Sequence, residues 1–152
     1  MTTNTERMMQ SIQEFSALAD ELDQLSEGCA GYSEDVRKAL GMSAANFNTC
    51  YTQSVDAAIQ IIPEDFVWYC PFHITGNTIL KGSVTEPVKT VQVFRPEPNS
   101  IYDLEKASSY APTLPLAICS AVCRLYSRFK QLNLDIYQAM QREELSEDEL
   151  DN

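Results

Sequence analysis

The sequence predicts a mainly α protein, a helical bundle with a small antiparallel β insert at about residues 65–95 and a long C-terminal helix. Apolar residues recur at three- and four-residue steps through the first and last thirds of the chain, which is the helical period. Residues 65–95 are instead rich in Val, Ile, Thr and aromatic residues, which is typical of strands. The length of 152 residues suits a single domain.

The first helix is expected to end at Gly28, a residue type that tolerates the left-handed geometry found at helix C-termini. Its acidic side chains fall largely off the apolar face. That face is formed by Met8, Ile12, Phe15, Leu18 or Ala19, Leu22 and Leu25.

Two further helices are expected before the insert. The first lies within residues 31–41, with Ser33 as its N-cap and Gly41 as its stop. The second opens at Ser43 and ends near Pro63. Its apolar stripe consists of Phe47, Cys50 or Tyr51, Val55, Ala58 or Ile59, and Ile62.

The insert is expected to hold three strands. The stretch "FHITGNTIL" predicts a hairpin that turns at Gly76–Asn77, and residues 88–95 predict a third strand. Trp68 and Tyr69 are expected to cover the core face of this sheet. Residues 101–115 are predicted to be a loop with about one helical turn. Pro115, at its end, suits the first position of the helix that follows.

The last helix is predicted to be the longest. A continuous apolar stripe runs along it through Leu116, Cys119, Val122 or Cys123, Tyr126, Phe129, Leu132 or Asn133, Ile136 and Met140.

The closing segment "REELSEDELDN", residues 142–152, has six acidic residues and only Arg142 as a base. Such a block predicts a flexible acidic tail beside a single helical domain at residues 1–141. We expect the tail to order only on a partner, because its composition buries too little apolar surface to offset the entropy of ordering. The predicted partner-binding residues are Leu145, Glu147, Asp148, Glu149, Leu150 and Asp151.

The net charge of −11 disfavours contact with nucleic acid or anionic membranes, because both are bound mainly through Lys and Arg. It suits a basic protein partner, or solubility alone. The stretch "MTTNTERMMQ" lacks the features of a signal peptide, so a cytosolic location and reduced cysteines are expected.

No catalytic, cofactor-binding or metal-binding residues are predicted, and the chain is not expected to be an enzyme. Cys70 and His73 could form a catalytic pair, but Pro71 separates them and strand spacing holds neighbouring side chains too far apart for direct proton transfer. Cys119 and Cys123 stand one helical turn apart, a spacing that can share a metal. A closed zinc site needs four ligands and no second pair is suitably spaced, so packing in the core is favoured.

A small basic group on the last helix consists of Arg124, Arg128 and Lys130. It is most simply a solvated face. It could also contact acidic residues of a neighbouring subunit.

The layout of helices, a short β insert, "PTLPLAICSAVCRLYSRFKQLNLDIYQAM" and a polar end resembles the head-to-tail adaptor (connector) proteins of tailed bacteriophages. The resemblance covers about residues 10–142. It rests on Pro112 and Pro115 before a late helix rich in Ala and Leu, and on Asp135 and Tyr137 in that helix's final turns.

This resemblance implies a virion structural protein that assembles into a dodecameric ring between the portal protein and the tail proteins. The C-terminal segment would reach into the portal and the β insert would face the tail. The ring would seal the DNA channel, and its acidic lumen would let DNA pass without specific binding.

Two other classes remain open. One is an acidic helical protein that binds and inhibits a basic partner, in the manner of a DNA mimic. The other is an enzyme whose site the sequence does not reveal. An adaptor should form a ring, an inhibitor a one-to-one complex, and an enzyme an apolar pocket with convergent titratable groups.

Overall fold

The computed structural model describes residues 3–42, 50–70, 89–95 and 106–150, with the backbone alone described at Lys89, Lys106 and residues 145–150. The fold is mostly helical, with a three-stranded antiparallel sheet and a long C-terminal helix that packs on the first helix, which confirms the predicted class. The elements are α1 (Asn4–Gln24), α2 (Ala30–Ala39), α3 (Val55–Ile59), β1 (Val67–Tyr69), β2 (Lys89–Phe94), β3 (Lys106–Ala111) and α4 (Leu114–Leu150).

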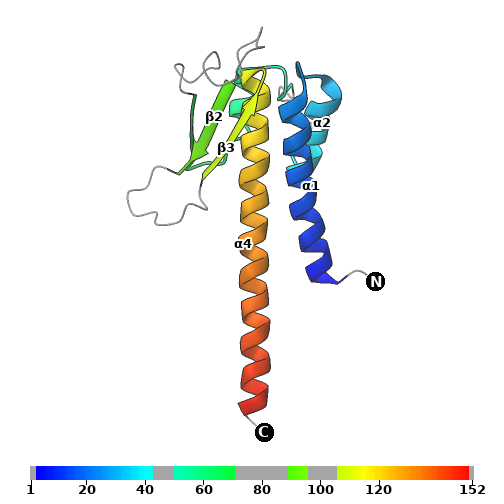
Figure 1. The fold of residues 1–152 in the computed structure, drawn as a ribbon, viewed down its shortest axis with the longest axis vertical. Helices are drawn as coiled ribbons and strands as arrows, with labels where there is room; N and C mark the ends of the chain where they lie inside the picture. The colour runs from blue at the N-terminus through cyan, green and yellow to red at the C-terminus, as the bar shows by residue number, and fades with distance from the viewer. Residues whose placement is uncertain (1–2, 43–49, 71–88, 96–105, 151–152) are drawn as a thin grey trace, which may run out of the picture.

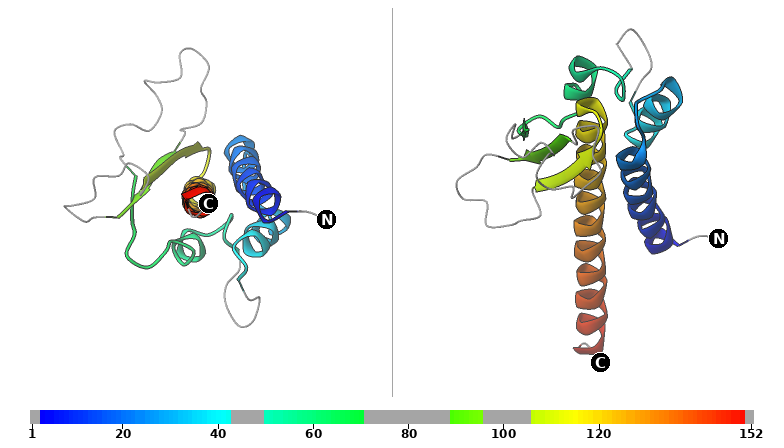
Figure 2. Two further views of the ribbon diagram at one scale, coloured as in Figure 1. Left: turned by 90° about the horizontal axis from the view of Figure 1, so that it is seen from below. Right: turned by 45° about the horizontal axis from the view of Figure 1, so that its top comes forward.

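Helix α4 forms the axis of the molecule (Figure 1). Seen along that axis, it lies between the sheet on one side and α1 with α2 on the other (Figure 2). Its first part is therefore buried on all sides, and a run of its side chains is fully or almost fully inaccessible: Leu116, Ala117, Ile118, Cys119, Ser120, Ala121, Val122, Cys123 and Leu125.

Helix α1 runs antiparallel to α4 and begins with a capping box. The Thr3 side chain accepts from the Glu6 amide, and the Glu6 carboxylate accepts from the Thr3 amide. Its buried residues Phe15, Ala19 and Leu22 lie on the predicted apolar face.

The expected stop at Gly28 is wrong, because α1 already ends at Gln24 with an extended Leu25 as C-cap. Gly28 is required for a different reason. It lies so close to the Thr52 backbone that a β-carbon would overlap the Thr52 carbonyl.

Helix α2 begins earlier than predicted, with Cys29 as its N-cap. Ser33 is a buried residue inside the helix. Its hydroxyl is 2.7 Å from Thr52 Oγ1, which also accepts from the Cys29 amide and donates to the Cys29 carbonyl. The hydroxyl expected to cap α2 therefore fastens it to the segment before α3.

The predicted third helix is much shorter in the structure. Residues 43–49 lie outside the described residues, residues 51–53 form a turn, and only Val55–Ile59 is helical. The side chain of Ser54 caps this helix. Tyr51 is buried even though its backbone is not helical, so the apolar spacing here reflects burial rather than helix.

The sheet has the strand order β1-β2-β3, and all pairs are antiparallel. Strand β2 confirms the strand predicted at residues 88–95. The hairpin predicted at Gly76–Asn77 lies outside the described residues. The register aligns Trp68, Val93 and Ala107 across the three strands, and all three pack in or against the core.

Strand β3 corrects the prediction of a loop over residues 101–115. Its alternation is one of size: Ala107, Ser109 and Ala111 are buried, whereas Ser108 and Tyr110 are exposed. Small inward residues let β3 approach α4 closely, and the Ser109 hydroxyl donates to the Ala117 carbonyl at 2.7 Å. In the described part of the chain, no helix combines the length and apolar character needed to cross a membrane.

Candidate partner-binding surface on the long helix

The residues predicted to bind a partner lie at the far end of α4. Leu145, Glu147, Asp148, Glu149 and Leu150 fall in its last turns, where the helical backbone continues without a break. Asp151 lies outside the described residues. Docking of this acidic segment on a partner stays a prediction.

Cys119 and Cys123 are packed inside the body of the protein, as the sequence favoured. The Cys119 thiol donates to the Tyr51 carbonyl at 3.1 Å. Burial raises the pKa of Cys119 well above its usual range and that of Cys123 to about 12. Both thiols are therefore protonated at neutral pH, and a protonated thiol is a poor nucleophile and metal ligand.

In the part that the structure describes, Trp68 lines an open pocket of about 440 Å³ together with Ile62 and Phe66. Trp68 and Cys70 pack against the core, but Tyr69 is exposed, so its expected place on the core face is wrong. His73 lies outside the described residues. Among the described residues, no group of three or more His, Cys, Asp and Glu is arranged to hold a metal ion.

One member of the basic group predicted on α4, Arg124, interacts with other residues of its own chain. Arg124 forms ion pairs within the chain, to Asp23 and, at 3.0 Å, to Asp20, both on α1. Its guanidinium also donates to Ser120, whose hydroxyl donates to the Ala19 carbonyl. These carboxylates raise the pKa of Arg124, against the effect of its partial burial, which lowers it.

A chain of aromatic contacts lies at the end of the buried part of α4. Phe15 of α1 stacks on Tyr126, Tyr126 meets Phe129 edge to face, and Phe129 meets Phe66 edge to face, with 5.7 Å between centroids at each step. The Arg95 guanidinium lies over the Phe66 ring at 5.2 Å. Beyond Phe129, α4 leaves the sheet side.

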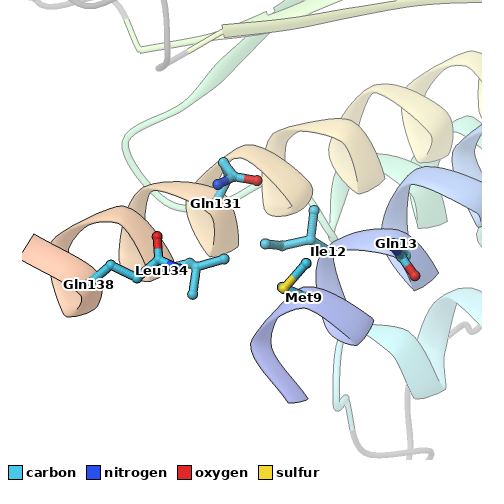
Figure 3. A pocket seen from close by; sticks show the side chains of 6 residues that line it. All are labelled: Met9, Ile12, Gln13, Gln131, Leu134 and Gln138. Carbon is cyan, nitrogen blue, oxygen red and sulfur yellow. The ribbon is translucent and has the colours of Figure 1, made fainter. Parts of the chain in front are cut away.

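A cleft opens where α1 begins and α4 continues (Figure 3). It has a volume of about 310 Å³, and Met9, Ile12 and Leu134 line its apolar part. Gln13, Gln131 and Gln138 supply amide groups. The described groups whose pKa values are shifted lie outside this cleft: Glu34, Arg37, Cys119, Cys123 and Arg124.

The face of α4 opposite Leu134 carries apolar residues that are exposed. Leu132 is 40% exposed, Ile136 50% and Met140 57%. The sequence placed them on one continuous core stripe with Leu116 and Phe129. The structure buries this stripe only as far as the aromatic chain, so the second half is available to another molecule.

Length was the property of the sequence that could have revealed this surface. A helix rises about 1.5 Å per residue, so the 37 residues of α4 extend about 56 Å and the 21 residues of α1 only about 32 Å. Figure 1 shows α4 extending well past the N-terminal end of α1. The apolar stripe of α4 is therefore longer than α1, the described helix that packs on it, and its second half extends past α1.

The arrangement suits docking of a helix or of a complementary groove on residues 132–144, flanked by acidic side chains at the C-terminal end.

No family model, curated protein or solved structure matches this chain.

Proposed function

We propose that this chain is a structural protein of a phage virion, a head-to-tail adaptor that forms a ring between portal and tail and seals the DNA channel. The observation that carries this proposal is the second half of α4. It extends beyond the body with Leu132, Ile136 and Met140 exposed, as expected of a helix that inserts into another component of an assembly.

The way in which α4 is held at one end also supports this role. The body is held by a contiguous core that includes α1, α4 and the sheet, so α4 is anchored firmly at one end. A rigid anchored helix loses little conformational entropy when it docks, which favours affinity. The acidic C-terminal segment adds charge that would steer it toward a basic site on a portal.

The net charge of −11 supports passage of DNA through such a ring. Carboxylates around a lumen repel phosphates and offer no counterion release on contact, so DNA would slide without being held. Partners of the ring would be the portal protein on one side and tail proteins on the other.

The test is to mix the full chain with purified portal rings of a phage that encodes it and to weigh the products by native mass spectrometry. A ring of chains on each portal is expected. Ile136→Glu should abolish the complex, because a carboxylate would be buried on the docking face. Gln60→Glu, which adds the same charge at the exposed end of α3, should leave it intact.

Absence of any portal complex would overturn the proposal. A one-to-one complex with a basic host protein, retained by Ile136→Glu, would favour the acidic inhibitor instead.

A further inference from the structure

We propose that two copies of this chain pair through the exposed half of α4, with the two helices antiparallel and Ile136 of one copy against Ala139 of the other. The pairing is a property of the free protein. It goes beyond the adaptor role and holds whether or not a portal is the partner.

The apolar residues of α4 follow the spacing of a helix–helix seam. They recur at alternating steps of four and three residues, the a and d positions of a heptad: Leu125, Phe129, Leu132, Ile136 and Ala139.

The chain itself covers only the start of this seam. Leu125 is buried and Phe129 packs on Phe66. Leu132, Ile136 and Ala139 are exposed, and Met140 beside them is the most exposed of the large apolar residues on α4. A second helix is the element that fits a seam of this period, because its own a and d side chains fill the gaps.

The charges beside the seam identify the occupant as a second copy. Asp135 and Arg142 are exposed and stand one heptad apart on the same edge. Asp135 comes one position before Ile136, and Arg142 comes one position before Glu143, where the heptad spacing of the seam continues. In an antiparallel pair with Ile136 opposite Ala139, Asp135 lies beside Arg142 of the other copy. Twofold symmetry repeats the contact, so each copy supplies both charges.

A parallel pair lacks this match. In register, it would place Asp135 beside Met140 and would bring Glu143 of the two copies together at the seam. Like charges facing each other across a contact oppose association. The order of charges along α4 therefore favours the antiparallel arrangement.

The pair would use only the stretch from Leu132 to Glu143, because the seam is already covered at Phe129. A crossing angle near about 20° is usual for this packing and lets the helices diverge toward their ends. The contact is short, so a weak dimer is expected, with two edge ion pairs setting its orientation.

The experiment is sedimentation equilibrium on the full chain, under reducing conditions, over a wide range of concentrations. The wild-type chain should reach a dimer and no larger species. Asp135→Arg alone sets Arg beside Arg, and Arg142→Asp alone sets Asp beside Asp. Each single variant should dimerise roughly tenfold or more weakly.

Mixing the two single variants should restore dimerisation, because every Arg then faces an Asp of the other chain. The double variant carrying both changes should recover it as well. Restored dimerisation is the result expected only if residue 135 of one copy lies beside residue 142 of the other.

Two control variants carry the same charge changes off the seam: Glu21→Arg on α1 and Lys130→Asp on α4, both at exposed positions. They should dimerise as the wild-type chain does. Unchanged circular dichroism and melting would show that all variants are folded.

A wild-type chain that stays monomeric, single variants that dimerise normally, or a mixture that behaves like its components would each overturn the pairing. Portal binding is measured separately. Single variants that lose dimerisation but still bind the portal would support the pairing and leave the adaptor role standing. Wild-type dimerisation without portal binding would overturn the adaptor role alone.

Discussion

The two halves of α4 differ sharply in the burial of their side chains. Residues 114–129 pass between α1 and the sheet and include a run of fully buried side chains. Residues 132–144 meet α1 at the cleft, where Leu134 and Gln138 lie beside Met9, and their opposite face carries exposed apolar residues. One helix therefore serves as the core at one end and as a free surface at the other.

The difference shows that an apolar period along a helix predicts a contact face. It does not tell whether the same chain or another molecule covers that face. Leu125 and Leu132 are the same residue type on the same face of the same helix, yet the first is fully buried and the second 40% exposed. Mutations in the first half should therefore act on folding, and mutations in the second half on association.

The largest effect is expected from Leu125→Ala. Removing a fully buried leucine side chain leaves a cavity beneath the sheet, and should lower the free energy of unfolding by about 2–5 kcal/mol. Leu132→Ala, the matched change in the exposed half, should lower it by less than about 1 kcal/mol.

Denaturant unfolding at low protein concentration measures both, because association would add a concentration-dependent term. Equal losses at the two positions would mean that the exposed half is covered in solution by the chain itself.

A smaller effect is expected where α1 is tied to the first half of α4. Arg124→Ala removes two ion pairs and leaves the Asp23 carboxylate, which is only 20% exposed, without its cation. We expect a loss of about 1–2 kcal/mol, since bonds to charged groups are strong but this site is partly hydrated.

The control is Lys130→Ala at an exposed position, which should cost less than about 0.5 kcal/mol. High salt should shrink the Arg124 effect through screening. An effect of the same size for both variants would show that the ion pairs contribute nothing specific.

The reactivity of the thiols distinguishes buried from exposed cysteines in the folded protein at neutral pH. Cys29 and Cys50 are exposed and should react with a thiol reagent in the folded protein, whereas Cys119 and Cys123 should react only after unfolding. Mass spectrometry of labelled peptides measures this, and rapid labelling of Cys123 in the native state would contradict its burial.

The same burial predicts how stability depends on pH. The pKa of Cys123 is about 12 in the folded state against an ordinary value of 9.0, so the folded state retains the proton that the unfolded state loses between these values. The contribution of this thiol to stability should therefore be constant below pH 9 and fall as the pH rises toward 12. Cys123→Ala should weaken this alkaline loss.

Much of the fold followed from local rules. The apolar face of α1, the strand at β2 and the long final helix were all predicted, because each has an uninterrupted period. Elements whose residues serve distant contacts were missed. Strand β3 alternates small and large residues because α4 lies against it, and Ser33 binds Thr52 rather than capping a helix.

The sequence did not predict the exposed apolar surface on α4 for a related reason. Composition directed attention to the acidic residues 142–152, whereas the exposed apolar residues Leu132, Ile136 and Met140 had been assigned to the core. Only the limited length of α1 and the sheet, a tertiary property, leaves them uncovered.

The smallest effect on stability is expected from truncation after Gln141. The segment removed carries six carboxylates and one guanidinium, and Arg142, Glu143 and Glu144 are exposed. Its loss relieves repulsion among like charges, so thermal melting at low concentration should be nearly unchanged. Association should weaken, because Arg142 is lost from the dimer seam and the acidic segment from the portal contact. Sedimentation and portal binding in low salt, where charge effects are strongest, measure the two losses separately. Unfolding on truncation would show that the last turns of α4 belong to the body after all, and full-strength association would show that they only add charge.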